Sequence, residues 1–167
     1  MQIKTQDNAE LAQLAELLEP MKVAMLGNVD ERGALVTRPM APLAMDADGS
    51  IWFFTDRRSS KAEHLGMLNL AFVDADRATY VSVSGRGELV DDRARIEQLW
   101  TPFAKPWFPD GPQSPNLVLL KVRPDTAEYW DAPNSRMVRL AAMAASVVAG
   151  KPIGMGEHDT LTSLSVN

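Results

Sequence analysis

Most of the chain alternates between hydrophobic and polar residues in short runs, which is the pattern of β-strands that bury one face. The clearest case is residues 79–90, where Tyr80, Ser82 and Ser84 alternate with valines. Segments with this pattern, or with a short apolar run bounded by turn residues, are predicted to be strands. They are residues 22–29, 34–45, 51–55, 70–74, 79–90, 117–122 and 126–130.

Residues that favour turns separate these strands and predict how neighbouring strands connect. The turns are residues 30–33, 46–49 and 75–77. Pro39 and Pro42 lie inside the second strand, which places it at an edge or a break of the sheet. Gly85 and Gly87 predict a bulge or a close approach of two backbones, and Pro124 separates the last two strands.

Few segments show the 3.6-residue period of an amphipathic helix. The first predicted helix begins near Asp7 and Glu10, which are spaced as an N-cap residue and an acidic residue of the first turn. Pro20 is expected to end this helix. Asp91 or Asp92 is expected to cap a second, short helix. The remaining expected helices are residues 61–67 and 137–149.

Many consecutive short strands with a few peripheral helices favour a mainly β fold. The strands do not alternate with helices as a doubly wound sheet requires, so we expect a closed or half-closed antiparallel barrel. The 167 residues are expected to form a single domain.

Composition excludes several classes of function. The net charge of −5 argues against nucleic acid as the general partner. The absence of cysteine excludes disulfides, thiolate catalysis and zinc–thiolate sites, and two histidines disfavour a histidine-rich metal site. The first residues show no apolar signal-peptide core, and the apolar segment 137–149 is too short to span a bilayer, so a cytoplasmic protein is expected.

The strand at 51–55 leads through a basic turn into the capping box Ser60-Lys-Ala-Glu63. A helix is therefore expected to start at Lys61, where free backbone N–H groups carry partial positive charge. Lys61 adds a full charge, and Arg57 and Arg58 lie close upstream. This combination suits a phosphate; the alternative is an ordinary strand–turn–helix connection with solvated charges.

Arg38 is a second candidate for binding the same anion. It lies on the strand joined by a hairpin to the strand at 51–55, and antiparallel pairing of the two is expected to bring it near Thr55 and Lys61. Arginine offers a phosphate two parallel hydrogen bonds. We therefore expect Arg38 and Lys61 to converge on one phosphate; the alternative is a solvated strand arginine.

Residues 101–116 form a long loop in which prolines alternate with the aromatic residues Phe103, Trp107 and Phe108. Loops of this length are usually functional or disordered. Exposed aromatic rings on a proline-stiffened loop favour contact with a ligand or another subunit. The alternative is that these rings cap the protein's own core.

Motifs of common enzyme classes are missing. Gly85-Arg-Gly87 lacks the third glycine of a dinucleotide fingerprint, and the chain has no phosphate-binding P-loop and no G-x-S-x-G nucleophile elbow. His64 is expected to be a surface or packing histidine rather than a catalytic one. No residue stands out as an indispensable acid or base.

Several stretches resemble the pyridoxamine 5′-phosphate oxidase-like split-barrel flavoproteins. They are Thr37-Arg-Pro-Met40, Trp52-Phe-Phe-Thr-Asp-Arg-Arg-Ser-Ser-Lys61 and Val81-Ser-Val-Ser-Gly-Arg-Gly-Glu-Leu89. The stretch Lys105-Pro-Trp-Phe-Pro-Asp-Gly-Pro112 is the most specific and is similar to the bacterial general stress protein 26 branch. The resemblance covers about residues 8–150, which leaves 151–167 as a C-terminal tail of the same domain.

The resemblance implies a six-stranded antiparallel split β-barrel of the Greek-key, FMN-binding type. It further implies a homodimer with FMN, or alternatively FAD, in a groove at the subunit interface. Arg38 and Lys61 are implied to hold the phosphate, and Ser60 stands where the oxidase has a second phosphate-binding arginine. The other implied flavin contacts are Met40, Phe54, Thr55, Ser82, Ser84 and, from the partner subunit, Trp107.

The oxidase's C-terminal Arg-x-His substrate motif has no counterpart in Glu157-His-Asp-Thr160, so pyridoxal phosphate synthesis is not expected. The first hypothesis is an FMN-dependent oxidoreductase of unknown substrate. The second is a flavin-binding stress protein that acts as a carrier or sensor without turnover. A third is a split barrel that holds another cofactor, such as deazaflavin or haem, of which haem is disfavoured by the two histidines.

Overall fold

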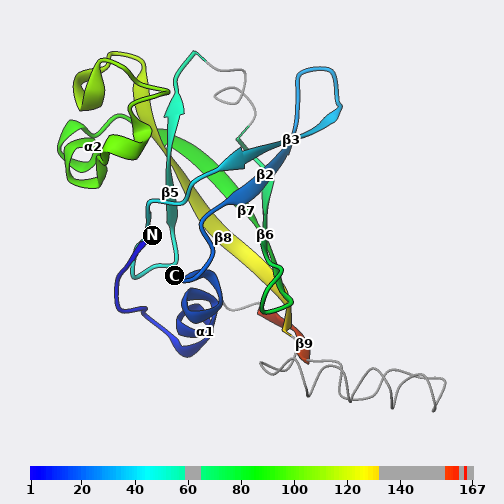
Figure 1. The fold of residues 1–167 in the computed structure, drawn as a ribbon. Helices are drawn as coiled ribbons and strands as arrows, with labels where there is room; N and C mark the ends of the chain where they lie inside the picture. Colours follow the sequence, from blue (N-terminus) through cyan, green and yellow to red (C-terminus); the bar gives the residue numbers. More distant parts are fainter. Residues whose placement is uncertain (59–64, 132–156, 162–163, 165–167) are drawn as a thin grey trace, which may run out of the picture.

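The computed structural model describes residues 1–58, 65–131, 157–161 and 164, and most of its regular structure belongs to one twisted sheet (Figure 1). The strands are β1 (Gln2–Ile3), β2 (Ala24–Val29), β3 (Leu35–Met40), β4 (Ala44–Met45), β5 (Ile51–Asp56), β6 (Leu68–Asp74), β7 (Thr79–Val90), β8 (Leu117–Asp131) and β9 (Glu157–Leu161). The helices are α1 (Ala9–Leu18), α2 (Arg93–Leu99) and the short 3₁₀ helices η2 (Pro102–Ala104) and η3 (Gly111–Gln113).

The strands follow the order β1-β4-β5-β8-β7-β6-β2-β3, and β9 pairs with β8 off this path. Every pairing is antiparallel except that of β1 with β4. The strands of six residues or more are β2, β3, β5, β6, β7 and β8. Within the described residues the path ends at β1 and β3 without closing. The predicted mainly β fold, an antiparallel split barrel with peripheral helices, is confirmed.

The prolines of the second predicted strand mark both a break and an edge, as expected. The segment divides into β3, which ends at Met40, and β4, which begins at Ala44, so Pro42 lies in the gap between them. Strand β3 pairs only with β2 in the described sheet, and an edge strand tolerates Pro39 because one side needs no partner.

Strand β8 is one continuous strand, and the prediction that Pro124 divides it in two is wrong. Pro124 pairs with Gly85 next to the shift in register between β7 and β8, where Asp125 is the extra residue of a bulge. On the other side of β8, residues before Pro124 pair with β5 and residues after it with β9, so no ladder bond depends on its missing N–H. A Cβ on Gly85 would overlap the carbonyl oxygen of Arg123, which confirms the predicted close backbone approach.

Helix α1 has a different N-cap from the predicted one. The cap is Asn8 rather than Asp7, because the Asn8 side chain accepts the backbone N–H of Leu11 at 2.8 Å. The helix ends at Leu18, ahead of Pro20, as predicted.

Helix α2 is capped by Asp92, one of the two predicted residues, whose side chain accepts the N–H of Arg95 at 3.0 Å. Of the helix predicted at 61–67, residues 65–67 are not helical. The rest of that segment, with His64, and the helix predicted at 137–149 lie outside the described residues.

Two hydrophobic cores lie on opposite faces of the β5–β8 part of the sheet. Neighbouring residues of β5 separate between them: Phe53 belongs to the first core and Trp52 to the second. Helix α1 packs on the first core, and α2 and η2 contribute to the second (Figure 1). The C-terminal tail, for which no element was predicted, supplies β9 and places Leu161 and Leu164 in the first core.

Asp46 links strand β5, helix α2 and the segment after β1. Its carboxylate accepts hydrogen bonds from Trp52 Nε1 of β5, Arg95 Nη2 of α2 and Lys4 Nζ after β1, each at 2.8 Å. The Arg95 guanidinium also lies 5.4 Å from the ring centroid of Trp52. Burial alone would raise the pKa of Asp46, but the hydrogen bonds from Lys4 and Trp52 and the nearby positive charges hold it below its usual value.

None of the helices in the described ranges is long and apolar enough to cross a membrane.

Candidate functional site

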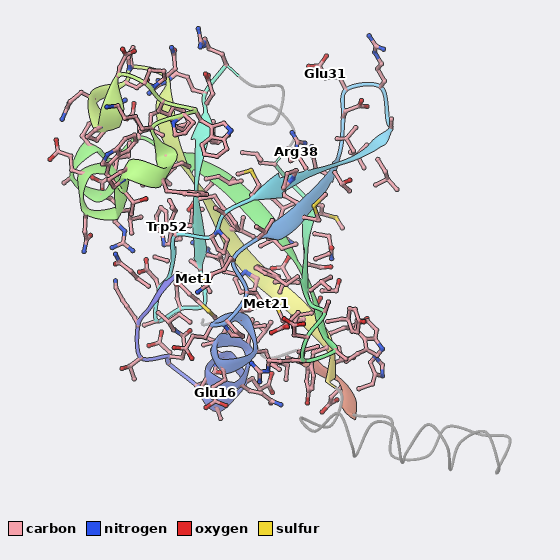
Figure 2. All side chains as sticks on the ribbon, in the orientation of Figure 1. Met1, Glu16, Met21, Glu31, Arg38 and Trp52 are labelled. Carbon is pink, nitrogen blue, oxygen red and sulfur yellow. The ribbon has the colours of Figure 1, made fainter. Side chains whose placement is uncertain are left out.

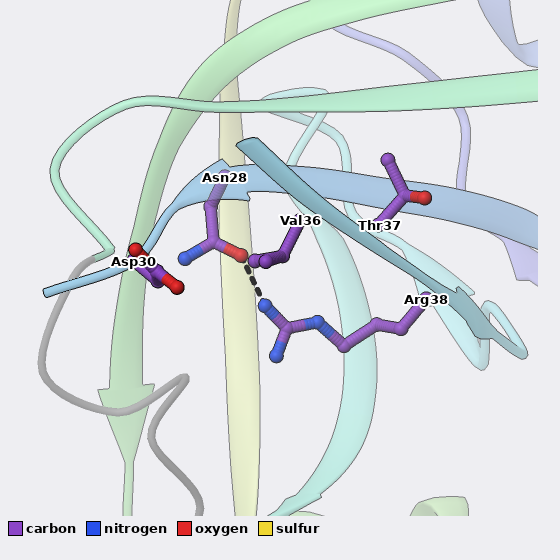
Figure 3. Close-up of a pocket in the computed structure, with 5 residues that line it drawn as sticks. All are labelled: Asn28, Asp30, Val36, Thr37 and Arg38. Atoms are coloured by element: carbon purple, nitrogen blue, oxygen red, sulfur yellow. Dashed lines mark hydrogen bonds between the residues drawn. The ribbon is translucent and has the colours of Figure 1, made fainter. Parts of the chain in front are cut away.

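A pocket of about 230 Å³ lies beside the hairpin of β2 and β3 (Figure 3). Its lining residues are Asn28, Asp30, Val36, Thr37 and Arg38. Figure 2 shows Arg38 on β3, well away from helix α1, on which Glu16 is labelled. The pocket therefore belongs to the end of the sheet that α1 leaves uncovered.

The alternation of the two strands brings Asn28 and Arg38 to the same side. In β2 the buried positions are Ala24, Leu26 and Asn28, which face the first core. Arg38 pairs with Leu26 across the strands, so Arg38 and Asn28 are diagonal neighbours on that inner face. A side chain as long as arginine spans this diagonal.

Arg38 is a partly buried cation with unused hydrogen-bonding capacity. Its Nη2 donates to Asn28 Oδ1, whereas its buried Nε has no hydrogen-bond partner within the described ranges. Desolvation by burial lowers the pKa of the Arg38 guanidinium, which nevertheless stays protonated because arginine titrates far above neutral pH. No salt bridge joins it to a described carboxylate. A small anion would both pair its charge and bind its free N–H.

The strand pairing predicted for Arg38 is wrong. Strand β3 pairs with β2, and only the two residues of β4 pair with β5, opposite Trp52 and Ile51 rather than Thr55. The reason is the break at Pro42, which ends one ladder before the next begins.

Met40 and Thr55 nevertheless share the inner face with Arg38. Met40 is two positions along β3 and lies in the first core, and Thr55 is two positions along β5 from Phe53 of the same core. The Thr55 hydroxyl is buried and has no hydrogen-bond partner in the described part of the chain. The inner face thus carries a second polar group able to bind a ligand.

Phe54, Ser82 and Ser84 lie elsewhere. The ring of Phe54 packs in the second core, with centroids 5.8 Å from Trp100 and 6.4 Å from Phe108. Ser82 and Ser84 occupy the outer face of β7, opposite to its buried valines. There they accept hydrogen bonds from Asn69 Nδ2, at 2.8 and 3.2 Å. These three residues therefore do not meet Arg38 on the inner face.

The basic turn after β5 contributes less free charge than its sequence suggests. Arg57 forms an ion pair with Asp91, and Arg58 pairs with Asp56 at 3.0 Å. The predicted phosphate contacts Ser60 and Lys61 lie outside the described residues.

The aromatic side chains of the loop between α2 and β8 differ in burial. Phe108 is buried in the second core, as the alternative interpretation expected. Phe103 and Trp107 are 71% and 67% exposed and lie against each other with ring centroids 5.8 Å apart. Trp107 therefore belongs to neither hydrophobic core of the described residues, and its predicted contact with a ligand or another subunit stays a prediction.

Asn28 and Asp30 were not predicted from the sequence as site residues. A signal for Asn28 existed: it is a polar residue at the third inward position of a strand whose other inward residues are Ala24 and Leu26. Buried amides of this kind are normally hydrogen-bonded to something specific. No described group of three or more histidine and carboxylate side chains is arranged to hold a metal ion.

Comparison with protein families matches residues 9–153 to the family described as "Pyridoxamine 5'-phosphate oxidase like". Protein bli-3 of Neurospora crassa is 28% identical over 152 residues, which are 83% of this chain and 73% of that protein. A protein of Jannaschia sp. CCS1 described as general stress protein 26 has a structure with a TM-score of 0.72 and 26% identity, covering 90% of this chain and 99% of that one. The general stress FMN/FAD binding protein of Xanthomonas citri is 30% identical, with a TM-score of 0.62 over 74% and 89% of the two chains.

Proposed function

Because the chain belongs to the pyridoxamine 5′-phosphate oxidase-like family, in its general stress protein 26 branch, we propose that it binds a flavin nucleotide, FMN or FAD. The observation that carries the proposal is the state of Arg38. Its guanidinium borders a pocket and has neither a carboxylate partner nor a hydrogen-bond partner for its buried Nε among the described residues. A phosphate group matches this guanidinium in both charge and hydrogen-bonding geometry.

The pocket fits the phosphate end of such a ligand. Its volume of about 230 Å³ is below the roughly 300–1,000 Å³ of pockets that enclose whole small ligands, so the rest of the flavin would lie outside it. Asp30, the carboxylate of the lining, accepts the backbone N–H groups of Arg32 and Ala34 at 2.9 Å. Those bonds hold Asp30 in its turn and partly offset its charge.

The roles of Lys61 and Ser60 are assigned from the resemblance to the family, and those of Met40, Thr55 and Phe54 from the faces of the strands on which they lie. Lys61 supplies the second phosphate cation, and Ser60, which replaces an arginine of the oxidase, supplies none. Met40 and Thr55 line the inner face beside Arg38. Phe54 supports that wall from the second core.

We further propose a homodimer with the flavin at the subunit interface. Two features support it: the exposed Trp107 with its neighbour Phe103, and an outer sheet face that carries exposed hydrophobic side chains. Those of the outer face are Met25, Val73, Tyr80 and Trp130. Ser82 and Ser84 lie on this outer face, so in a dimer they are available to a flavin held by the other protomer.

When bound, a flavin supplies hydride or single-electron transfer, and we propose an oxidoreductase of unknown substrate. The chain's residues bind and orient the cofactor: Arg38 and Lys61 anchor its phosphate, and Trp107 shields it from water. The second candidate is a flavin carrier or sensor without turnover. It is supported by the sequence, in which no residue stands out as an indispensable acid or base.

The test is a fluorescence titration of the protein with FMN and FAD. Micromolar or tighter binding is expected, and the double variant Arg38→Ala, Lys61→Ala should weaken FMN binding on the order of a hundredfold or more, because each lost charge-assisted hydrogen bond is worth about 1.5–3 kcal/mol. The matched control is Arg58→Ala, an exposed arginine already paired with Asp56. Absence of flavin binding by the unaltered protein refutes the proposal.

A second measurement separates the two candidate functions. Reduction of the bound flavin by NADH or NADPH at a rate well above that of free FMN supports the oxidoreductase. Tight binding with an unreactive flavin supports the carrier or sensor.

A further inference from the structure

We propose that Asn28 is a positioning residue for Arg38: it fixes the guanidinium in the orientation that binds an anion and leaves its charge unneutralised. The inference rests on the proposed function, since it concerns the same anion site. It adds a residue that holds the phosphate-binding group rather than the phosphate.

The position of Asn28 in the fold indicates a specific role. Its side chain is on the core side of β2, and the residue is only 4% exposed, where an amide is unfavourable unless it is hydrogen-bonded. The preceding inward residues, Ala24 and Leu26, are fully buried and apolar. Figure 3 shows the amide oxygen of Asn28 turned toward the guanidinium of Arg38, which reaches it diagonally across the hairpin.

The contact restricts a side chain that is otherwise long and flexible. One terminal nitrogen of Arg38 is tied to Asn28 Oδ1, and the amide nitrogen of Asn28 donates to the carbonyl of Val29 at 3.2 Å, which orients the amide. Arg38 is thereby held beside the pocket with its Nε unpaired in the described structure. An anion then meets a guanidinium whose rotamer is already set.

An amide suits this role better than a carboxylate of the same shape. A carboxylate at position 28 would accept the same hydrogen bond but would form a buried ion pair with Arg38 and compete with an incoming phosphate. An amide accepts the bond without charge. The affinity of the site for an anion is therefore expected to depend on one atom of residue 28, an amide nitrogen or a carboxylate oxygen. A substitution that exchanges the two tests this directly.

The test compares Asn28→Asp, which keeps the shape and adds a negative charge, with Asn28→Leu, which keeps the size and removes the acceptor. The control is Gln98→Glu, the same amide-to-carboxylate change on an exposed position of α2, where the acceptor of Arg95 is retained. Each protein is titrated with FMN and with riboflavin, which is FMN without its phosphate. Far-UV circular dichroism and thermal unfolding establish that each variant is folded.

We expect Asn28→Asp to weaken FMN binding by about tenfold to a hundredfold, the range for one charge-assisted hydrogen bond. Asn28→Leu should weaken it by a smaller factor, about threefold to tenfold, because the cation remains but loses its anchor. Riboflavin affinity should stay within about twofold in both, since no phosphate is present. Gln98→Glu should change neither ligand.

Two results would overturn the inference: unchanged FMN affinity in folded Asn28→Asp, or an equal loss of FMN and riboflavin affinity. Should Asn28→Asp not fold, the FMN-to-riboflavin selectivity of Asn28→Leu decides, and an unchanged ratio overturns the inference. If the unaltered protein binds no FMN, the proposed function fails and inorganic phosphate becomes the probe. Phosphate binding weakened by Asn28→Asp then supports the positioning role, and no binding or no change overturns it.

Discussion

The β7–β8 ladder offers a graded test of the fold, because three glycines near it differ in what surrounds them. A Cβ on Gly85 would overlap the carbonyl oxygen of Arg123 and lie 3.0 Å from its carbonyl carbon. A Cβ on Gly87 would meet the side-chain ends of Leu68 at 2.8 Å and Leu120 at 3.1 Å. A Cβ on Gly66 would meet no atom of the described residues within 4 Å.

The expected loss of stability depends on whether backbone or a side chain has to move to make room for the new Cβ. In Gly85→Ala the obstacle is backbone, so β7 and β8 must separate locally, with overpacking of about 1–3 kcal/mol and the loss of one or two ladder bonds at about 0.5–1.5 kcal/mol each. We expect Gly85→Ala to lower the free energy of unfolding by the sum of these contributions, about 1.5–6 kcal/mol, which is large beside the typical 5–15 kcal/mol. Gly87→Ala should cost about 1–2 kcal/mol, because leucine side chains can rotate away.

Gly66→Ala is the matched control. No described atom lies near a Cβ at this position, and its φ lies outside the left-handed region. Alanine should therefore raise the free energy of unfolding by about 0.4–1 kcal/mol, because it reduces the conformational entropy of the unfolded chain. The assay is urea unfolding followed by tryptophan fluorescence and circular dichroism. The expected order of stability is Gly66→Ala, then Gly87→Ala, then Gly85→Ala. Gly85→Ala as stable as Gly87→Ala would refute the close packing of β7 on β8.

Two further outcomes are expected from the helix cap and the acidic cluster. Asn8→Ala should lower the free energy of unfolding by about 1 kcal/mol and Asp7→Ala by much less, because only Asn8 accepts the N–H of Leu11; equal effects in urea unfolding would contradict the assigned cap. The pKa of Asp46 is lowered in the folded protein, so its stabilisation is complete above the unfolded value of about 3.9 and disappears as pH falls through the lower folded value. The stability gap between the unaltered protein and Asp46→Asn should therefore narrow below about pH 4, and a gap that is constant from pH 7 to pH 3 would contradict this.

Most of the strands could be predicted because their signals are local. Residues 79–90 alternate with a period of two, and the structure has β7 with the same bounds. The break at Pro42 and the tight glycine at 85 followed from the chemistry of single residues. The prediction at Pro124 failed because its signal is not local. Whether a proline ends a strand depends on the neighbouring strands, and Pro124 lies between the segments of β8 that pair with β5 and with β9.

The candidate site could be predicted in its residue types but not in its arrangement. Arg38 is identifiable as an anion-binding candidate, yet its predicted approach to Thr55 by pairing of neighbouring strands was wrong, because β3 pairs with β2. Met40 and Thr55 do share its inner face, whereas Ser82 and Ser84 occupy the outer face. Asn28 was missed altogether.

The sequence by itself determined the mainly β class, the succession of strands and turns, and a cation at position 38, because these depend on side-chain periodicity and backbone chemistry within a few residues. Only the tertiary structure decided the strand order, the continuous β8, the tail strand β9 and the meeting of Arg38 with Asn28. Most of these pairings join residues distant in the chain, whereas Arg38 and Asn28 are ten residues apart in one hairpin and meet because both face the same side of it. The register of a pairing follows from which faces can be buried together. Local preferences do not determine which side chains meet in the folded protein. The free energy of packing does, because it sums over the whole molecule.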